Sequence, residues 1–228
     1  MLKEEEHIMT EIEAIRARHA VRNYTAKPLS PEIIDELSQE IEQCNRQGQL
    51  HIQLVTENEE AFKTFIPLFG RFKNVKNYIA LAAKKQGDFY VKCGYCGARL
   101  MVKAQQAGLN SCWVTNTYNA KKCPVTLAPD EELVGVIAIG YGTTDGTQHK
   151  SKSMERLCKP CSDKWFTDGM NAAVLAPTGL NRQNFFIEAN GNTVSIRTKD
   201  NHPMSQINTG IVKYHFEIGA GRENFNWE

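Results

Sequence analysis

The chain has 228 residues, enough for one large domain or two small ones with a substantial buried core. Its 27 Lys and Arg residues nearly balance 26 Asp and Glu residues, which excludes a global basic field that would attract nucleic acid or an anionic membrane. Any anion-binding site must therefore be local.

Residues 1–15, MLKEEEHIMTEIEAI, are acidic and lack the apolar run of a signal peptide. No apolar stretch in the sequence approaches the length that spans a bilayer. The seven cysteines are an odd number without an export signal, which favours reduced thiols over a disulfide scaffold. We therefore expect a cytoplasmic protein.

A basic segment, residues 16–22 (RARHAVR), follows. It concentrates charge at Arg16, Arg18, His19 and Arg22. Arginine presents a planar set of donors that suits phosphate oxygens. The alternative is a solvated basic face that balances the acidic leader.

The next elements predict an α+β arrangement. Ser30 before Pro31 is typical of a helix start, and Gly48 is expected to end that helix. Further helices are expected at residues 59–69 and 87–107, the latter ending at Gly108, with strands at 51–57, 78–83, 111–115 and 133–140. Because a single helical pattern separates the strands at 78 and 111, strict alternation is disfavoured. Gly94 and Gly97 predict a close approach of another helix.

Residues 143–164 carry no large apolar cluster and are the best linker candidate. They include Lys150 and Lys152, which either complete a phosphate site or belong to an ordinary polar linker. A helix (165–176), two strands (185–189 and 193–198) joined by a turn at Asn190 and Gly191, and a final apolar helix are expected beyond them. We predict a first unit at 1–145, a linker at 146–162 and a second unit at 163–228.

The polar corner, residues 176–183 (APTGLNRQ), joins a helix to a strand in the second unit. Such residues are ordinary in turns, but they would also clamp a flat ligand. Its Asn181, Arg182 and Gln183 repeat the tripeptide at residues 45–47 in a similar context, which suggests an internal duplication.

Two CxxC pairs, Cys93 with Cys96 and Cys158 with Cys161, raise a metal site or a redox dithiol as alternatives. Their wide separation argues against a compact zinc ribbon, and Cys93 lies on an apolar helix stripe. We assign no metal ligands. No phosphate-binding GxxxxGK[ST] loop and no GxGxxG after a strand is present in the sequence.

Five segments together resemble the nitroreductase family of flavoproteins: residues 18–24 (RHAVRNY), 107–114 (AGLNSCWV), 136–142 (VIAIGYG), the Lys150-Ser151-Lys152 triplet and the polar corner. In that family the corner usually follows the basic signature by a single helix, where this chain has only residues 44–47 (CNRQ). The displacement suggests a single-chain tandem subgroup, in which the second unit replaces the partner subunit of a homodimer. The resemblance thus implies a nitroreductase-like α+β fold with a mixed, mostly antiparallel sheet, flanking helices and two half-units forming a pseudo-dimer.

The resemblance also implies one FMN site per chain. Arg18, Arg22, Lys150 and Lys152 would surround the phosphate, with His19 and the Ala20 backbone near the phosphate or ribityl chain. Ala20 replaces a family serine. The residues that would flank the ring and ribityl oxygens are Trp113, Pro177, Thr178 and Asn181, and Arg71 or Lys73 would lie near the pyrimidine edge.

The activity implied is ping-pong transfer of reducing equivalents from NADH or NADPH through FMN to a nitroaromatic, a quinone or a similar small acceptor. Neither nucleic acid nor membrane is expected as a partner, and the protein would be a monomeric pseudo-dimer or a weak homo-oligomer. Two other classes stay open. One is a non-catalytic flavin- or small-molecule-binding protein whose pocket Phe225 and Trp227 cover, and the other is a metal-binding module built on the CxxC pairs.

Overall fold

The computed structural model describes residues 8–63 and 72–228. Its α-helices are α1 (Glu11–Ala17), α2 (Pro31–Gly48), α3 (Phe89–Gln106), α4 (Lys164–Ala173) and α5 (Pro203–Ala220). Its strands are β1 (Gln53–Val55), β2 (Asn77–Lys84), β3 (Asn110–Val114), β4 (Glu131–Gly140), β5 (Phe185–Asn190), β6 (Thr193–Thr198) and β7 (Asn226–Trp227). Among these described helices, none is long and apolar enough to cross a bilayer.

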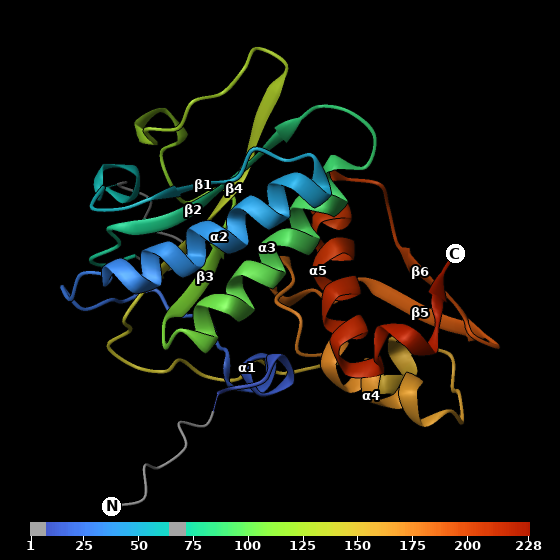
Figure 1. Ribbon diagram of the computed structural model, residues 1–228. Helices are drawn as coiled ribbons and strands as arrows, with labels where there is room; N and C mark the ends of the chain where they lie inside the picture. The colour runs from blue at the N-terminus through green and yellow to red at the C-terminus, as the bar shows by residue number, and fades with distance from the viewer. Residues whose placement is uncertain (1–7, 64–71) are drawn as a thin grey trace, which may run out of the picture.

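The larger sheet has the order β1-β2-β4-β3, and every neighbouring pair is antiparallel. Helices α2 and α3 lie across one face of this sheet (Figure 1). A second apolar cluster around Tyr24, Phe62 and Tyr78 covers the other face. Burial on both faces explains why β2 reads as a continuous apolar run. The predicted α+β fold with a mostly antiparallel sheet and flanking helices is confirmed.

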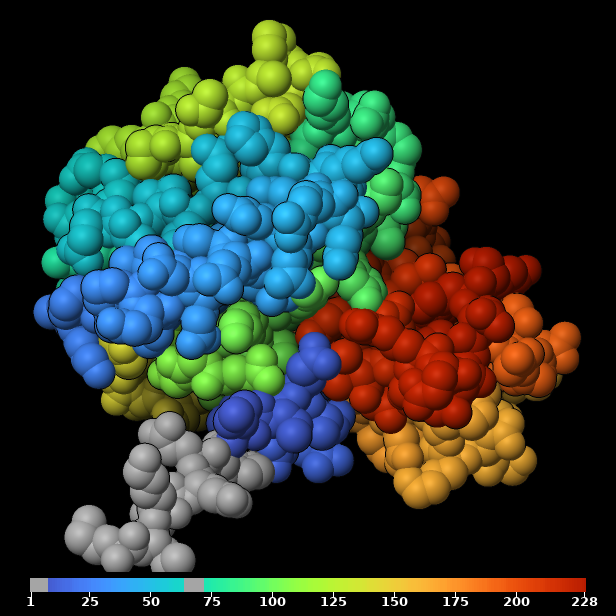
Figure 2. Space-filling view, in the orientation of Figure 1, coloured from blue at the N-terminus to red at the C-terminus, as the bar shows by residue number. Residues whose placement is uncertain are grey.

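The C-terminal part adds α4, α5 and a smaller sheet of order β5-β6-β7, in which β7 runs parallel to β6. Figure 2 shows these elements gathered on one side of the molecule, with the segment of α1 at their boundary with the first unit. One hydrophobic cluster contains residues of both predicted units, among them Cys93, Val102, Ile211 and Phe216. The two units therefore share a core, and the division at 146–162 stays a prediction.

Helix α5 crosses α3 at a point of very close backbone approach. A Cβ atom at Gly94 would lie 2.1 Å from the Ile207 carbonyl oxygen, and one at Gly210 would lie 1.9 Å from the Val91 carbonyl oxygen. The predicted helix contact at Gly94 is thus found. Gly97 serves a different contact, because its missing Cβ makes room for the indole of Trp113.

Local signals explain where the long helices begin and end. The Ser30 hydroxyl accepts a hydrogen bond from the Ile33 N–H, and Pro31 occupies the first turn of α2. Gly108, with φ of +74°, ends α3 in a Schellman motif in which the Leu109 N–H donates to the Ala104 carbonyl. The predicted end at Gly48 is confirmed, since Gly48 is the last residue of α2 and Gln49 follows it as a left-handed C-cap.

Several other boundaries differ from expectation. Helix α1 was not predicted, although Thr10 and Glu13 form a capping box at its start. The helix expected at 59–69 is a single 3₁₀ turn at Glu60–Phe62, and its remainder from residue 64 lies outside the described residues. The hairpin loop consists of Gly191 and Asn192, one residue later than expected, because Asn190 still pairs with Thr193.

Candidate functional site

The basic segment joins the first unit at the free edge of β3. Arg18 caps α1 through its backbone N–H, and Ala20 forms a parallel bridge with Ser111. The Val21 N–H donates to the Ser111 carbonyl at 3.1 Å. Arg22 is exposed, and its carbonyl accepts the N–H of Lys73. Along this segment the side chains of Arg18 and Val21 are buried, whereas Ala20 and Arg22 are exposed.

Arg18 is the cation that points inward. Its side chain is only 4% exposed, and neither Nε nor Nη1 has a hydrogen-bond partner among the described residues. Burial lowers the pKa of Arg18 to about 10. A buried guanidinium without an anion is costly, so this position calls for a negatively charged ligand.

Three histidines lie in the region of Arg18. The pKa of His19 is lowered first by its burial and then by the charges of Arg18 and His149. The same two charges act on His215, whose ring is buried in α5 and whose Nε2 has no partner among the described residues. The Ser111 hydroxyl is also buried without a partner in that set. The region thus combines the end of α1, β3, the linker and α5.

The linker runs directly against the basic segment. A Cβ atom at Gly146 would lie 2.9 Å from the Cβ of His19 and 3.1 Å from the Ala20 carbonyl oxygen. Further along, the His149 ring donates from Nε2 to the Val174 carbonyl at 3.0 Å. His149 therefore connects the basic segment to the end of α4.

The Lys150-Ser151-Lys152 triplet is fastened to the polar corner. The Val174 carbonyl accepts from the Ser151 hydroxyl at 3.1 Å and from Nε2 of Gln183 at 2.9 Å. Oε1 of Gln183 accepts the backbone N–H of Lys152 at 2.7 Å, and Nδ2 of Asn181 donates to the Lys150 carbonyl at 2.8 Å. Two segments about thirty residues apart in the chain thus form one rigid unit.

The Lys152 ammonium also connects the triplet to the polar corner. It donates to the Arg182 carbonyl at 2.5 Å and to the Gln183 carbonyl at 3.0 Å, with Oδ1 of Asn184 at 3.5 Å. These contacts use the three donors of the ammonium. Lys150, by contrast, exposes its side chain to solvent.

The polar corner is strained. Leu180, Asn181 and Gln183 have φ of +52°, +51° and +43°, a region that residues with a Cβ rarely occupy. Such conformations cost roughly 1–3 kcal/mol each and persist only where the surroundings enforce them. Here the Thr178 hydroxyl accepts the Gln183 N–H at 3.0 Å, and Oδ1 of Asn208 in α5 accepts the Gly179 N–H at 3.1 Å.

The structure therefore brings several predicted site residues together and separates others. His19 and Ala20 meet the linker, and Arg18 lies close enough to His19 to lower its pKa. Lys150, Lys152, Thr178 and Asn181 meet at the polar corner, with Pro177 half-buried in the same corner. Trp113 packs its ring against Gly97 of α3, and its indole N–H is buried without a partner in the described part. Arg71 lies outside the described residues, and Lys73 reaches the site only through its backbone contact with Arg22.

Sequence reasoning missed His149, Ser111 and His215. His149 directly precedes the basic triplet, so its position offered a signal. Ser111 and His215 gave no such signal in the sequence, because both reach the region of Arg18 only through the packing of distant elements. Gln183 was recognised within the polar corner but not as its central hydrogen-bonding residue.

The other suggested features lie elsewhere. Phe225 stacks on Trp165 of α4 with ring centroids 5.6 Å apart, and the Trp227 indole donates to Glu217 of α5 at 2.8 Å. They complete the core of the second unit instead of covering the site. All seven cysteines are free thiols, and within residues 8–63 and 72–228 no three His, Cys, Asp or Glu side chains converge as a metal site.

The repeated tripeptide differs in conformation between its two positions. Asn45 lies in the last turn of α2 and holds the backbone of Ile52 by two hydrogen bonds. Asn181 and Gln183 instead have positive φ. The shared letters therefore give no structural support to a duplication, which stays a prediction.

The architecture, a four-stranded antiparallel sheet flanked by helices with a basic segment at its edge, is that of nitroreductase-like proteins. The family model described as "Putative TM nitroreductase" matches residues 11–220, and the chain belongs to that family. A "putative nitroreductase" from Thermotoga maritima has 20% sequence identity and a TM-score of 0.66, with 97% of this chain and 88% of that chain covered.

Shorter relatives align with part of the chain. A "putative nitroreductase" from Desulfovibrio desulfuricans in complex with FMN has 17% identity and a TM-score of 0.54, covering 67% of this chain and 98% of that one. A "Putative NADH dehydrogenase/NAD(P)H nitroreductase" from Parabacteroides distasonis has 19% identity and a TM-score of 0.53, covering 64% of this chain and 95% of that one. A search of curated proteins gave no match.

Proposed function

We propose that the protein is an FMN-dependent oxidoreductase of the nitroreductase type. The observation that carries the proposal is the buried Arg18, whose Nε and Nη1 lack hydrogen-bond partners in the described part of the chain. The family membership supports an oxidoreductase, and the Desulfovibrio desulfuricans relative supports FMN as the ligand. Unpaired buried donors fit a phosphate group.

The candidate residues would contact different parts of FMN. Arg18, Arg22 and Lys150 would hold the phosphate, and His19 with the Ala20 backbone would lie beside the phosphate or ribityl chain. Lys152 already donates to carbonyls of the polar corner, so we assign it to positioning that corner. FMN supplies the redox chemistry when bound, so the protein needs no nucleophile of its own.

The polar corner would supply the face toward the ring and ribityl oxygens. Pro177, Thr178 and Asn181 are held there by a strained backbone and by hydrogen bonds to the triplet and α5. A rigid corner suits this role, since its conformational entropy is already lost in the folded protein and need not be lost on ligand binding. Trp113 would contribute through its backbone at the edge strand, because its ring is committed to α3.

The proposed electron donor is NADH or NADPH, and the proposed acceptor is a nitroaromatic, a quinone or a similar small molecule, each using the site in turn. We further propose that the second unit takes the place of a partner subunit. The shorter relatives cover 64–67% of this chain, a share close to that of the predicted first unit. The hydrogen bonds that fasten the Lys150-Ser151-Lys152 triplet to the polar corner are consistent with the same arrangement.

The test begins with the visible spectrum of the purified protein and a titration with FMN, followed by NADH and NADPH. The variant Arg22→Ala with Lys150→Ala should weaken FMN binding by roughly 100-fold or more, because it removes two charge-assisted hydrogen bonds that contribute about 1.5–3 kcal/mol each. The matched control is Arg46→Ala with Lys121→Ala, which removes two exposed charges elsewhere. Equal affinity in both variants would refute the phosphate site, and a flavin that neither nucleotide bleaches would refute the proposed donor.

A further inference from the structure

A cavity of about 220 Å³ lies between α4 and the chain around residues 154–161, among residues to which the proposed flavin site makes no claim. Four of the side chains that line it carry sulfur: Met154, Cys158, Cys161 and Met170. Phe166 forms part of the remaining wall. The second CxxC pair thus faces a space with two thioethers.

The fold holds one thiol of this pair firmly. Cys158 forms a parallel bridge with Ile187 of β5. The Ile187 N–H donates to the Leu157 carbonyl at 2.8 Å, and the Lys159 N–H donates to the Ile187 carbonyl at 3.1 Å. Sγ of Cys158 lies 3.4 Å from the Met154 carbonyl oxygen. Cys158 is therefore a fixed, buried wall of the cavity.

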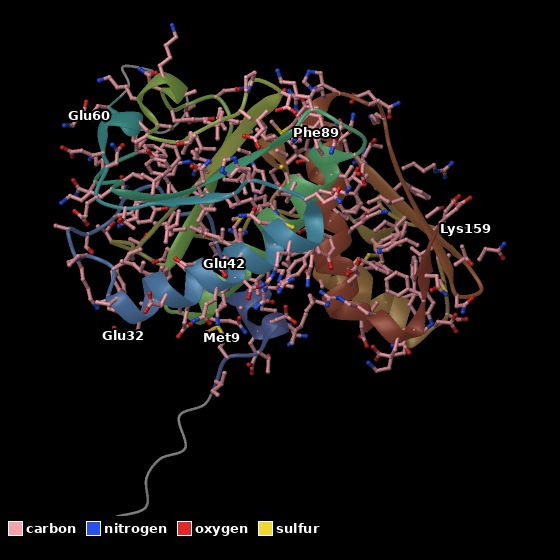
Figure 3. The ribbon with its side chains drawn as sticks, turned by 45° about the horizontal axis from the view of Figure 1, so that its top comes forward. Met9, Glu32, Glu42, Glu60, Phe89 and Lys159 are labelled. Carbon is pink, nitrogen blue, oxygen red and sulfur yellow. The ribbon has the colours of Figure 1, made fainter. Side chains whose placement is uncertain are left out.

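The second thiol is accessible. Cys161 is half-buried, whereas the other six cysteines are buried. It lies in a stretch without helix or strand, and its thiol is 3.6 Å from Oδ2 of Asp163. Lys159, between the two cysteines, is exposed and lies on the flank of the molecule beside the C-terminal elements (Figure 3). The cavity can therefore be reached through the segment that carries Cys161.

Sulfur in a protein core often serves packing alone, since Met and Cys fill irregular space well. Cys93 and Cys96 show that use, because both thiols are buried along α3. The second pair differs, since its thiols border open volume and one of them reaches solvent. This arrangement is suited to a ligand.

The donor set selects the ligand. Zinc sites use four thiolate, imidazole or carboxylate ligands, and in the described part of the chain no three such side chains converge. Thiolates together with thioethers are the soft ligands that Cu(I) prefers. We propose that Met154, Cys158, Cys161 and Met170 form a binding site for Cu(I).

Binding would release a proton from each thiol that becomes a thiolate ligand.

The test is an anaerobic titration of the full chain with Cu(I) in competition with a chromogenic Cu(I) chelator. We expect one tightly bound Cu(I) per chain. Cys158→Ala with Cys161→Ala should lower the affinity by more than about 100-fold, which exceeds the ~10–100-fold typical of losing an outer partner of a metal ligand. Met154→Leu and Met170→Leu should each lower it by about tenfold, a smaller loss because a thioether carries no charge.

Cys93→Ala with Cys96→Ala is the matched control, since it removes the other CxxC pair and should leave Cu(I) affinity unchanged. Circular dichroism establishes that each variant is folded, and the two methionine variants keep the test valid if a cysteine variant unfolds. Unchanged affinity in the Cys158 and Cys161 variant, equal losses in the control, or tighter binding of Zn(II) than of Cu(I) would each overturn the proposal. FMN affinity should not change in any of these variants, so this test is independent of the flavin assignment.

Discussion

The guanidinium of Arg18 is buried while its Nε and Nη1 find no acceptor among the described residues. Removing one partner from a buried ion pair is destabilising because it leaves a charge uncompensated, and the ligand-free protein is in that situation here. A bound phosphate would supply the missing anion. The same residue therefore lowers stability in one state and raises affinity in the other.

We predict that Arg18→Met leaves the free energy of unfolding of the ligand-free protein unchanged or raises it by about 1–2 kcal/mol, as replacing buried charges by apolar residues often does. FMN should raise the unfolding midpoint of this variant much less than that of the wild type, because the buried phosphate contact is gone. Urea unfolding with and without excess FMN measures both effects. Arg16→Met, an exposed position on α1, is the control and should keep the full stabilisation by FMN.

His215 provides a pH-dependent test of the same region. Burial is the main cause that lowers the pKa of His215 to about 3, and the charges of Arg18 and His149 act in the same direction. The ordinary pKa of 6.5 applies in the unfolded chain, so acid protonates the unfolded state first. The contribution of this residue to stability is complete above pH 6.5 and is lost as the pH falls toward 3.

The expected result is a decrease in the free energy of unfolding of up to about 1.4 kcal/mol per pH unit from this one group. His215→Gln should remove that component of the slope below pH 6.5, while His202→Gln, an exposed histidine, should retain it. Urea unfolding at a series of pH values checks this. An identical slope in the wild type and in His215→Gln would contradict the prediction.

At the scale of elements, what the sequence could predict depends on how local each signal is. The start of α2 at Ser30 and Pro31 and the end of α3 at Gly108 depend on neighbouring backbone alone. Both could therefore be predicted from the sequence. The capping box of Thr10 and Glu13 was equally local, and α1 could have been predicted from it. Gly48 also ends α2 as expected, but the sequence alone does not reveal that its small size makes room for the Leu50 side chain.

The sequence identified candidate site residues but not the contacts that each of them makes in the fold. Lys152 was expected at the phosphate, yet its ammonium donates to carbonyls about thirty residues away in the chain. Trp113 was expected near the ring, yet its indole fills the space left by Gly97. Both outcomes depend on tertiary contacts, which a pattern of residue types does not encode.

The crossing of α3 and α5 yields a prediction at this scale. Gly→Ala inside a helix normally stabilises by roughly 0.5–1 kcal/mol. At Gly210 the added Cβ would lie 1.9 Å from the Val91 carbonyl oxygen and 2.6 Å from the Tyr95 nitrogen, so the two backbones would have to separate. We expect Gly210→Ala to lower the free energy of unfolding by about 3 kcal/mol or more, as severe overpacking does.

Gly108→Ala is the contrasting variant. No atom lies within 4 Å of its added Cβ, but its φ of +74° disfavours a side chain. A loss of about 1–2 kcal/mol is expected there from the left-handed conformation alone. Chemical denaturation of both variants separates the effect of overpacking from that of the left-handed backbone. A smaller loss of unfolding free energy at Gly210 than at Gly108 would show that the crossing of α3 and α5 can relax.

At the scale of the whole molecule, the linker is more than a connection. It lies against the basic segment at Gly146 and is fastened to the polar corner through Gln183. The shared apolar core also joins the two predicted units.

This yields the last prediction. If the second unit replaces a partner subunit, each chain should bind one FMN, and the affinity should not depend on protein concentration, since no association step precedes binding. Titrations at protein concentrations spanning about two decades, with light scattering for the mass, measure this. Asn181→Ala should weaken FMN binding by the same factor at every concentration, because its amide anchors the corner to Lys150 within one chain. An affinity that rises with protein concentration, or half an FMN per chain, would instead show that the site is completed by a second copy.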